Sequence, residues 1–402
     1  MTKNRSLLSL ICLLASLPLF CASGDQAVAE FLKRNGIPNN SVAVKIVDLQ
    51  DGNILASHNE EASLVPASIM KSVTTAALLE SAGPDWRYHT RIYIDGPIYL
   101  GYLRGNVIVE GACDPTINSE KEPYSEDIIE EIYSALAAQQ INRIEGGIII
   151  DENNFSGSPH PVSWAKEDRR KYYGTGSHAF NYSDNASGDF AISDPAKQFI
   201  ILLKNNLAAK GIELEDKEIT EGRRIQLHVH QSAPLDEIMR SCMMRSDNLF
   251  AESMLRTYGK LGGGDGSTAS ATSQEMTLWK EKNLPLEGVN IVDGSGLSRS
   301  NRVTANFMSE LLCSMSQNPF YASFFPLAGQ EGTLKKFLAG TSLDSYVAMK
   351  TGSMRGIQCY AGYKLDDDYI PTHVIVIIMN DITNSRDRAK KAAEDMLLSI
   401  FE

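Results

Sequence analysis

Cysteine, basic residues and long hydrophobic runs are all scarce in this 402-residue chain. Its six cysteines follow no zinc-ligand spacing, so the sequence indicates no structural zinc site. Acidic residues number 50 against 38 lysines and arginines, which gives a net charge of −12. Since nucleic-acid binding requires basic patches, we expect no nucleic-acid partner.

Several common catalytic signatures are missing as well. The chain has no Gly-x-Ser-x-Gly and no His-Glu-x-x-His, which weighs against an α/β-hydrolase esterase and a metalloprotease. The stretch Gly262–Gly266 lacks the Lys-Ser/Thr of a phosphate loop and is typical of a flexible loop. His228 and His230 share one side of a probable strand without a third ligand nearby, so we expect a solvated strand face, no metal and no cofactor.

The longest apolar run, Leu7 to Phe20, is too short to span a bilayer comfortably. Lys3 and Arg5 precede it and small residues follow it at positions 21–23, which is the pattern of a secretory signal peptide. We expect residues 1–23 to be removed, no transmembrane segment after that removal, and an exported protein of the periplasm or cell envelope. Lipoprotein anchoring through Cys21 is the weaker alternative, because Phe20 before it fits poorly.

A serine and a lysine three residues apart stand at Ser68 and Lys71, just after Pro66. A serine hydroxyl is a poor nucleophile at neutral pH and needs a neighbouring base. Residues three apart share one face of a helix, and the apolar residues of the stretch 69–79, stopped by Gly83-Pro84, predict that helix. Lys71 can therefore accept the proton of Ser68. The alternative is a surface serine beside a solvated lysine.

A second motif, Lys350-Thr351-Gly352-Ser353, follows a β-rich apolar run and predicts a strand. Lys350 and the hydroxyls of Thr351 and Ser353 form a cationic, donor-rich rim suited to a carboxylate. Gly352 has no side chain, so a substrate can approach the backbone closely. The backbone N–H groups of Ser68 and Ser353 are the natural oxyanion donors.

A third motif, Ser246-Asp247-Asn248, lies between two predicted helices, 235–244 and 249–258. Ser246 can relay a proton between Lys71 and the leaving amine, and Asn248 can donate to and accept from a substrate amide. Taken alone, this tripeptide is more typical of a helix cap, and one residue can do both. The three motifs in this order indicate an acyl-transfer site built on an active serine.

Two of these motifs occur a second time, at Ser163-Trp164-Ala165-Lys166 and at Ser183-Asp184-Asn185. Only a short stretch separates this second pair. Lys166 also leads into the charged run 167–171, which cannot form a buried helix. We therefore expect the second pair not to be catalytic.

With these motifs the chain resembles the D-alanyl-D-alanine carboxypeptidase/endopeptidase family of low-molecular-mass class C penicillin-binding proteins, peptidase family S13. The resemblance runs from about residue 26 to residue 400. Further segments that resemble the family are Asp293-Gly294-Ser295-Gly296-Leu297-Ser298-Arg299, the turn 110–116 with Cys113 in place of a glycine, the segment 177–185, Gln231-Ser232-Ala233-Pro234-Leu235 and Leu327-Ala328-Gly329.

The resemblance implies a serine enzyme that cleaves D-Ala-D-Ala termini of peptidoglycan stem peptides and often the cross-links between them. It implies that Ser68 is acylated, with Lys71 as base and Ser246 as proton shuttle, and that β-lactam antibiotics trap Ser68. The implied substrate-binding residues are Asn248, Lys350, Thr351, Gly352 and Ser353, with Arg299 and Met354 beside the substrate side chain. A homo-oligomer is left open.

Five strands are predicted from both chain ends, at 41–48, 53–57, 346–351, 357–364 and 373–379, with helices at 26–35 and 386–401. They suggest an antiparallel sheet with a helical middle, 235–316, beside it, hence an α+β architecture with the site at the sheet–helix boundary. The resemblance implies the transpeptidase fold that penicillin-binding proteins share with β-lactamases, in which an all-helical subdomain accompanies a five-stranded antiparallel sheet.

The stretch between Ser68 and Ser246 is longer than a single-domain acyltransferase needs. We therefore expect a serine D,D-peptidase domain at 24–86 and 226–402 and a smaller α/β domain inserted at 87–225, with strands at 90–94, 106–110 and 147–151 and a helix at 125–139. After Asn185 the chain passes quickly to Asp194-Pro195 and a helix, 196–210. The further domain nested in larger family members is thus expected to be absent.

Two other functions stay open on the sequence. A β-lactamase needs a positioned base for fast deacylation, and the sequence does not tell whether an acid such as Glu252 points at the ester. A non-catalytic cell-wall binding protein on the same fold is the second alternative, against which the intact motifs argue. The balance between trimming and cross-link cleavage also stays open. The four cysteines after the signal are expected to be mostly buried free thiols.

Overall fold

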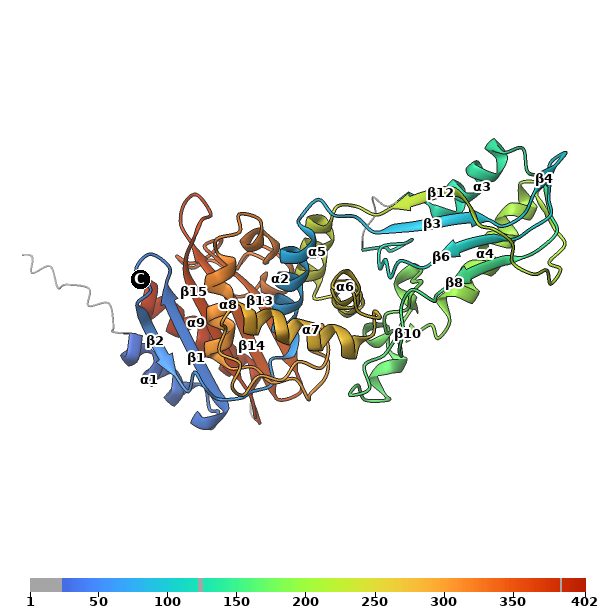
Figure 1. Cartoon of the computed structure of the whole chain (residues 1–402). Helices are drawn as coiled ribbons and strands as arrows, with labels where there is room; N and C mark the ends of the chain where they lie inside the picture. The colour runs from blue at the N-terminus through green and yellow to red at the C-terminus, as the bar shows by residue number, and fades with distance from the viewer. Residues whose placement is uncertain (1–23, 122–125, 384) are drawn as a thin grey trace, which may run out of the picture.

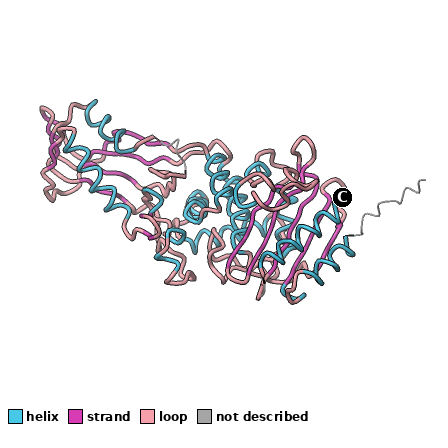
Figure 2. The backbone as a smooth tube through the Cα atoms, turned by 180° about the vertical axis from the view of Figure 1, so that it is seen from behind, coloured by secondary structure: helices cyan, strands magenta, loops and turns pink. Residues whose placement is uncertain are grey.

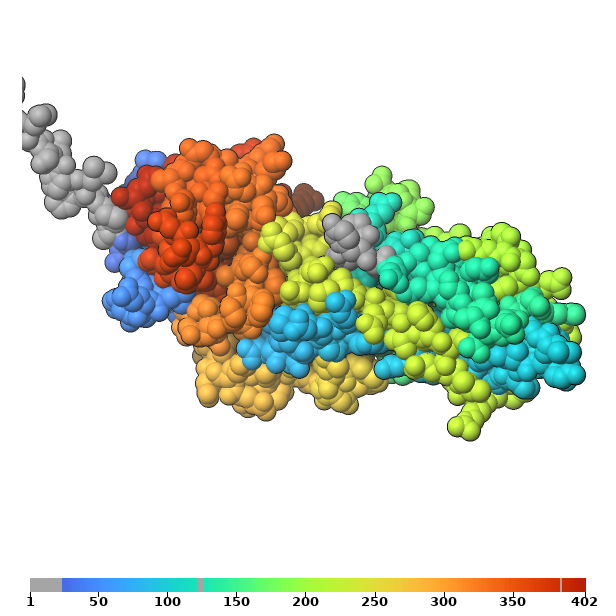
Figure 3. Space-filling view, turned by 90° about the horizontal axis from the view of Figure 1, so that it is seen from above, coloured from blue at the N-terminus to red at the C-terminus, as the bar shows by residue number. Residues whose placement is uncertain are grey.

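The computed structural model describes residues 24–121, 126–383 and 385–402, and the expected signal peptide, residues 1–23, lies outside them. The described chain has two lobes at opposite ends, with helix α6 (Asn248–Leu261) between them (Figure 1). A view from above shows the same elongated arrangement (Figure 3).

The larger lobe is built on a five-stranded sheet whose strands come from both ends of the chain. All neighbouring strands in it are antiparallel, because hairpins join most of them. The α+β class and the five predicted strands are confirmed. In spatial order the strands are β13 (Val347–Met354), β14 (Ile357–Leu365), β15 (Pro371–Met379), β1 (Val42–Asp48) and β2 (Ile54–His58).

Different helices cover the two faces of this sheet. Side chains alternate along a strand, so Val376 of β15 joins one buried core and its neighbour Ile377 joins the other. The core of Ile377 includes residues of α1 (Gly24–Arg34) and α9 (Arg386–Phe401). These two helices lie side by side across the strands (Figures 1 and 2), so the beginning and the end of the described chain pack together.

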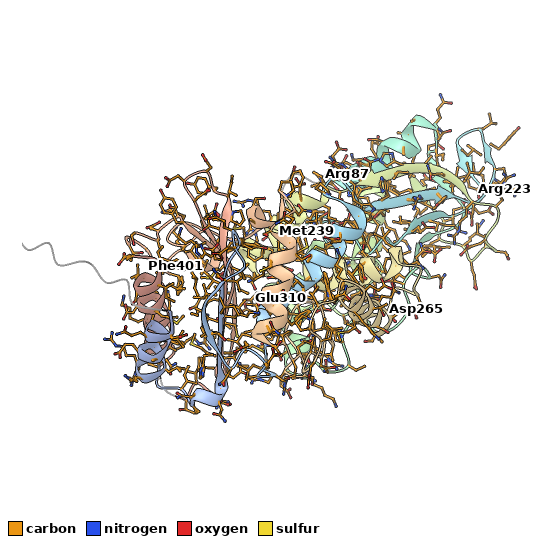
Figure 4. The ribbon with its side chains drawn as sticks, turned by 60° about the vertical axis from the view of Figure 1, so that its left-hand side comes forward. Arg87, Arg223, Met239, Asp265, Glu310 and Phe401 are labelled. Atoms are coloured by element: carbon orange, nitrogen blue, oxygen red, sulfur yellow. The ribbon has the colours of Figure 1, made fainter. Side chains whose placement is uncertain are left out.

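The other face carries the all-helical part of the lobe. Glu310 of α8 (Ala305–Met315) pairs with Lys45 of β1 at 3.1 Å and so joins this helix to the sheet. Figure 4 labels Glu310 together with Met239 of α5 (Leu235–Arg245). Met239 is buried in the same core as Val376. Besides α6, the helices are α2 (Met70–Ala82), α5 (Leu235–Arg245), α7 (Thr268–Glu281) and α8 (Ala305–Met315).

The smaller lobe has an apolar core of its own, made by residues from Ile92 to Ile212. That separate core supports an inserted domain, while the boundaries at 87 and 225 stay a prediction. Figure 4 labels Arg87 where the chain enters this lobe and Arg223 at its far end. One sheet of this lobe contains β12 (Ile225–Gln231), β3 (His89–Ile94), β6 (Val107–Glu110) and β8 (Ile148–Asp151). A second sheet contains β11 (Glu213–Leu214), β7 (Arg143–Ile144), β5 (Tyr102–Leu103) and β4 (Ile98–Tyr99). The lobe also contains the hairpin of β9 (Ala186–Ser187) and β10 (Phe190–Ala191) and the helices α3 (Ile128–Ala138) and α4 (Pro195–Ala209).

The expectation of a solvated face at His228 and His230 is wrong. His230 is fully buried, and its Nδ1 lies 2.7 Å from Oε2 of Glu131, while Nε2 of His228 lies 3.4 Å from the same oxygen. The physical reason is that helix α3, which carries Glu131, packs against β12. Neither histidine belongs to a cluster of metal-binding side chains, and none occurs among the described residues.

Within the part of the chain that the structure describes, no helix is both long and apolar enough to cross a membrane. The four cysteines there, Cys113, Cys242, Cys313 and Cys359, are free thiols, and all except Cys313 are buried. This agrees with the expectation of mostly buried free thiols.

Candidate active site

Ser68 lies in a tight turn just before helix α2. The turn is a 3₁₀ element, Ala67–Ile69, and Ala67 has a φ of 48°, a left-handed conformation that is uncommon for alanine. The predicted helix then runs from Met70 to Ala82 and ends at Gly83, whose φ of 78° suits glycine. The turn therefore presents the serine at the beginning of the helix that carries Lys71.

The ammonium group of Lys71 makes three contacts. Its Nζ lies 3.2 Å from Oγ of Ser68, 2.6 Å from Oδ1 of Asn248 and 2.7 Å from the carbonyl oxygen of Ser295. The residue is fully buried, and burial lowers its pKa, although nearby acidic groups oppose this. A lysine with a lowered pKa beside a serine hydroxyl is suited to accept its proton.

Ser246 and Asn248 lie where α5 ends and α6 begins. Ser246 adopts a left-handed conformation (φ 59°) and terminates α5. The cap of α6 is Asp247, whose side chain accepts a hydrogen bond from the N–H of Phe250 at 3.0 Å. Of the three residues of this motif, Asp247 is therefore the helix cap. Ser246 lines the same cleft as Ser68.

The side-chain amide of Asn248 joins the smaller lobe to the site. Its Oδ1 accepts from Lys71, and its Nδ2 donates to the carbonyl oxygen of Tyr173 at 2.8 Å. Tyr173 lies in the segment predicted as an insertion, and nothing in the sequence signals this contact. Since an amide nitrogen carries two hydrogens, one N–H of Asn248 is left for a ligand.

Lys350 and Thr351 lie on β13, at the edge of the large sheet. Lys350 is fully buried, and its Nζ donates to the carbonyl oxygen of Thr351 at 2.9 Å. Burial, helped by the positive charge of Lys71, lowers the pKa of Lys350. The hydroxyl of Thr351 donates to Oγ1 of Thr333 at 2.7 Å.

Gly352 and Ser353 follow on the same strand. A Cβ atom on Gly352 would lie 2.5 Å from the carbonyl oxygen of Pro66 and 3.1 Å from the nitrogen of Ser68. The space that the sequence assigned to an approaching substrate is thus used by the protein backbone itself, which brings β13 against the turn of Ser68. The hydroxyl of Ser353 donates to Oε1 of Gln358 at 2.7 Å.

Each of the three motifs contributes to the wall of a cleft of about 320 Å³, through Ser68, Ser246, Thr351 and Ser353. Lys71, Asn248 and Lys350 are not among the residues that line it. Arg386, Asp387 and Lys390 of helix α9 also line it, and the sequence gave no reason to include them. Two of these are cations, which suits an anionic ligand. The full lining is Ser68, Ser246, Thr333, Leu334, Phe337, Thr351, Ser353, Gln358, Tyr360, Arg386, Asp387 and Lys390.

Arg299 and Met354 are not among the residues that line this cleft. Arg299 is exposed, and its Nη2 donates to the carbonyl oxygen of Arg355 at 2.5 Å. Met354, the last residue of β13, is half-buried and packs against the helical core. Both therefore lie near the end of β13, beyond the wall of the cleft.

The second copies of the motifs lie apart from Ser68. Lys166 is exposed, and Asn185 is buried with its Nδ2 donating to Oδ1 of Asn181 at 2.7 Å. Ser183 and Asp184 line a different cavity, of about 830 Å³. None of the residues of the three motifs around Ser68 lines that cavity.

A buried lysine beside a serine, a second serine across the cleft and a Lys-Thr-Gly strand along its edge define an active-serine acyltransferase of the penicillin-binding class. The chain belongs to the D-Ala-D-Ala carboxypeptidase 3 (S13) family, whose model matches residues 25–187 and 180–400. Family membership makes it a serine-type carboxypeptidase, a hydrolase, and the β-lactamase and the non-catalytic alternatives are not favoured.

Similar proteins agree with this assignment. D-alanyl-D-alanine carboxypeptidase DacB of Haemophilus influenzae is 23% identical over 399 residues, which cover 79% of this chain and 80% of that protein. The D-alanyl-D-alanine carboxypeptidase of Actinomadura sp. strain R39 is 23% identical over 407 residues, 80% of this chain and 74% of that protein. The crystal structure of penicillin binding protein 4 from Haemophilus influenzae superposes with a TM-score of 0.79 at 21% identity, covering 92% of this chain and 98% of that one. This likeness confirms the fold expected from the resemblance.

Proposed function

We propose that this protein removes the terminal D-alanine of peptidoglycan stem peptides through an acyl-enzyme on Ser68. The observation that carries the proposal is the position of Lys71, fully buried, with Nζ 3.2 Å from Oγ of Ser68. Burial favours the neutral amine of Lys71, which is the form that can take a proton.

In the first step Lys71 accepts the hydroxyl proton of Ser68 while Oγ attacks the penultimate D-Ala carbonyl carbon. The backbone N–H groups of Ser68 and Ser353 stabilise the oxyanion that develops. Ser246 passes the proton from Lys71 to the leaving amine, and free D-alanine departs. Water then attacks the ester by the reverse proton path and releases the shortened peptide.

Substrate binding is assigned to the edge of β13 and its surroundings. Lys350, Thr351 and Ser353 bind the terminal carboxylate. The proposal rests on Thr351 and Ser353, which line the cleft, and on the buried cation of Lys350 beside them on the same strand. Gly352 keeps that strand against the turn of Ser68. The free N–H of Asn248 binds a substrate amide. Arg299 and Met354, beyond the cleft wall, contact the side chain of the stem peptide.

The same acyl-enzyme chemistry also cleaves cross-links, because these too follow a D-Ala carbonyl. Solved relatives support this and the trapping of Ser68 by β-lactams. Penicillin binding protein 4 of Haemophilus influenzae has been solved in complex with a β-lactam, and a predatory endopeptidase of Bdellovibrio bacteriovorus has been solved acylated by penicillin G. A peptidoglycan substrate requires the protein to act outside the cytoplasm, in the periplasm or cell envelope.

The test is to incubate residues 24–402 with a labelled penicillin and to follow the mass of the adduct over time. A long-lived adduct on Ser68, absent from Ser68→Ala, supports the proposal. Rapid loss of the adduct with hydrolysed drug would indicate a β-lactamase, and no adduct would indicate a binding protein. Release of D-alanine from a peptide ending in D-Ala-D-Ala, but not from one ending in L-Ala-L-Ala, completes the test.

A further inference from the structure

Helix α6 contacts Lys71 by two routes. Asn248, in its first turn, accepts directly from Nζ of Lys71. Glu252 follows four residues later, on the same face of the helix. Its Oε1 accepts hydrogen bonds from the backbone N–H groups of Gly294 at 3.1 Å and Ser295 at 2.8 Å. The carbonyl oxygen of Ser295 in turn accepts from Nζ of Lys71 at 2.7 Å.

We propose that Glu252 is a positioning residue for the acylation step, because it anchors the backbone at the N–H of Ser295, the residue whose carbonyl oxygen directs Nζ of Lys71 toward Ser68. This inference rests on the proposed function of Lys71 as the base. A lysine side chain has four rotatable bonds, and a misplacement of about 1 Å in a reacting group can cost roughly 10²-fold in rate. Contacts with Asn248 and Ser295 together fix Nζ from two sides.

The setting of Glu252 is unusual for a carboxyl that only fills space. It is almost fully buried, and burial, with the charge of Asp293, raises its pKa to about 8, although the two backbone N–H groups act against this. Burying a carboxyl group costs free energy. A second buried carboxyl, Glu275 of α7, lies close enough to Glu252 for the charge of Glu252 to raise the pKa of Glu275 as well. Glu252 is 1% exposed and does not line the cleft, so we assign it an action on Lys71 through the protein backbone and not a contact with substrate.

Above about pH 8, where it is ionised, Glu252 also acts on Lys71 through its charge. The acidic groups that raise the pKa of Lys71 are Cys242, Asp247, Asp293 and Glu252, and the opposing cation is Lys350, whose own pKa Lys71 lowers. Replacing Glu252 by glutamine removes this charge and should lower the pKa of Lys71 in that pH range. Because acylation needs neutral Lys71, any part of the acidic limb above pH 8 would move to lower pH.

The experiment measures the rate of acylation by labelled penicillin between pH 5 and pH 10. Glu252→Ala loses both hydrogen bonds, so its plateau should fall by roughly 10–100-fold. Glu252→Gln keeps an acceptor oxygen, so its plateau should stay within about threefold of wild type, with any part of the acidic limb above pH 8 shifted to lower pH. The matched control is Glu275→Gln, which also removes a buried carboxyl beside the site but no contact with Gly294 or Ser295, and should keep the wild-type plateau.

Two results would overturn the inference: wild-type acylation in Glu252→Ala, or a loss in Glu275→Gln as large as in Glu252→Ala. If Glu252→Ala does not fold, Glu252→Asp takes its place, because its side chain is one methylene shorter and should lose the same two hydrogen bonds; wild-type acylation in it would overturn the inference as well. A wild-type protein that penicillin does not label would overturn the proposed function itself. A labelled wild type with unaffected Glu252 variants would overturn this inference only.

Discussion

Gly352 and Pro66 are in contact through their backbones, and a Cβ atom on Gly352 would lie 2.5 Å from the carbonyl oxygen of Pro66. The nitrogens of Ser68 and Ile69 would each lie 3.1 Å from the same Cβ. These are backbone atoms of the turn that carries the nucleophile, so they cannot rotate away as a flexible side chain would. The close approach of β13 to the turn of Ser68 therefore depends on the absence of a Cβ atom at position 352.

Gly352→Ala should destabilise the protein and slow acylation. Overpacking of this kind costs about 1–3 kcal/mol, and a shift of the strand away from Ser68 should lower the acylation rate by roughly 10–100-fold. Thermal unfolding and penicillin labelling measure the two effects. The control is Gly147→Ala, whose Cβ would meet only Oδ1 of Asp216, at 3.0 Å. Wild-type labelling of Gly352→Ala would show that the strand can move without consequence.

Lys71→Ala should slow acylation of Ser68 by roughly 10²–10⁴-fold, the usual contribution of a general base. The rate of adduct formation with penicillin measures it. Lys166→Ala is the matched control, because Lys166 stands in the second copy of the same motif and its side chain is exposed. Equal rates in Lys71→Ala and wild type would remove Lys71 as the base.

Local patterns were enough to predict the elements that carry the site. The apolar residues after Ser68 predicted the helix of Lys71, and the turn signal at Gly83 predicted its end, as observed. Apolar runs rich in β-forming residues predicted all five strands of the large sheet to within a few residues. Such patterns depend only on neighbours in the sequence, so they can be read without knowing the fold.

Contacts between distant segments could not be predicted in this way. The bond from Asn248 to the carbonyl oxygen of Tyr173 uses a backbone atom, which every residue has. The contribution of Arg386 and Lys390 to the cleft depends on where α9 crosses the sheet. The burial of His230 depends on the packing of α3 against β12. Each of these follows from tertiary packing, which overrides local patterns.

Trp164→Phe should weaken the attachment of the smaller lobe to the site. Trp164 is buried, and its Nε1 donates to Oδ2 of Asp293 at 2.8 Å. A hydrogen bond to a charged group contributes about 1.5–3 kcal/mol, so the free energy of unfolding should fall by that amount, as urea denaturation would show. Tyr172→Phe is the control, since it removes only an exposed hydroxyl and should change stability by less than about 0.5 kcal/mol.

The same substitution should slow acylation several-fold, because Asp293 also accepts from the N–H groups of Gly296 at 2.8 Å and Ser298 at 2.7 Å. These bonds shape the loop that contains Ser295, on which the position of Lys71 depends. An unchanged unfolding free energy in Trp164→Phe would show that Asp293 finds another donor.

Glu275→Gln should make the stability of the protein less sensitive to pH between about pH 5 and pH 8. Burial, with the charge of Glu252, raises the pKa of Glu275 from its ordinary 4.5 to about 8. The folded protein therefore keeps a proton that the unfolded chain releases above its ordinary pKa, so the free energy of unfolding falls as the pH rises through this window. The slope for one such group is up to about 1.4 kcal/mol per pH unit.

Replacing Glu275 by a neutral amide removes this slope, so the variant should gain stability relative to wild type as the pH rises from 5 to 8. Urea denaturation at several pH values in that range measures the gain. Glu281→Gln, an exposed change on the same helix, should show no such trend. A stability difference between the variant and wild type that does not change with pH would mean that the pKa of Glu275 is not raised in the folded protein.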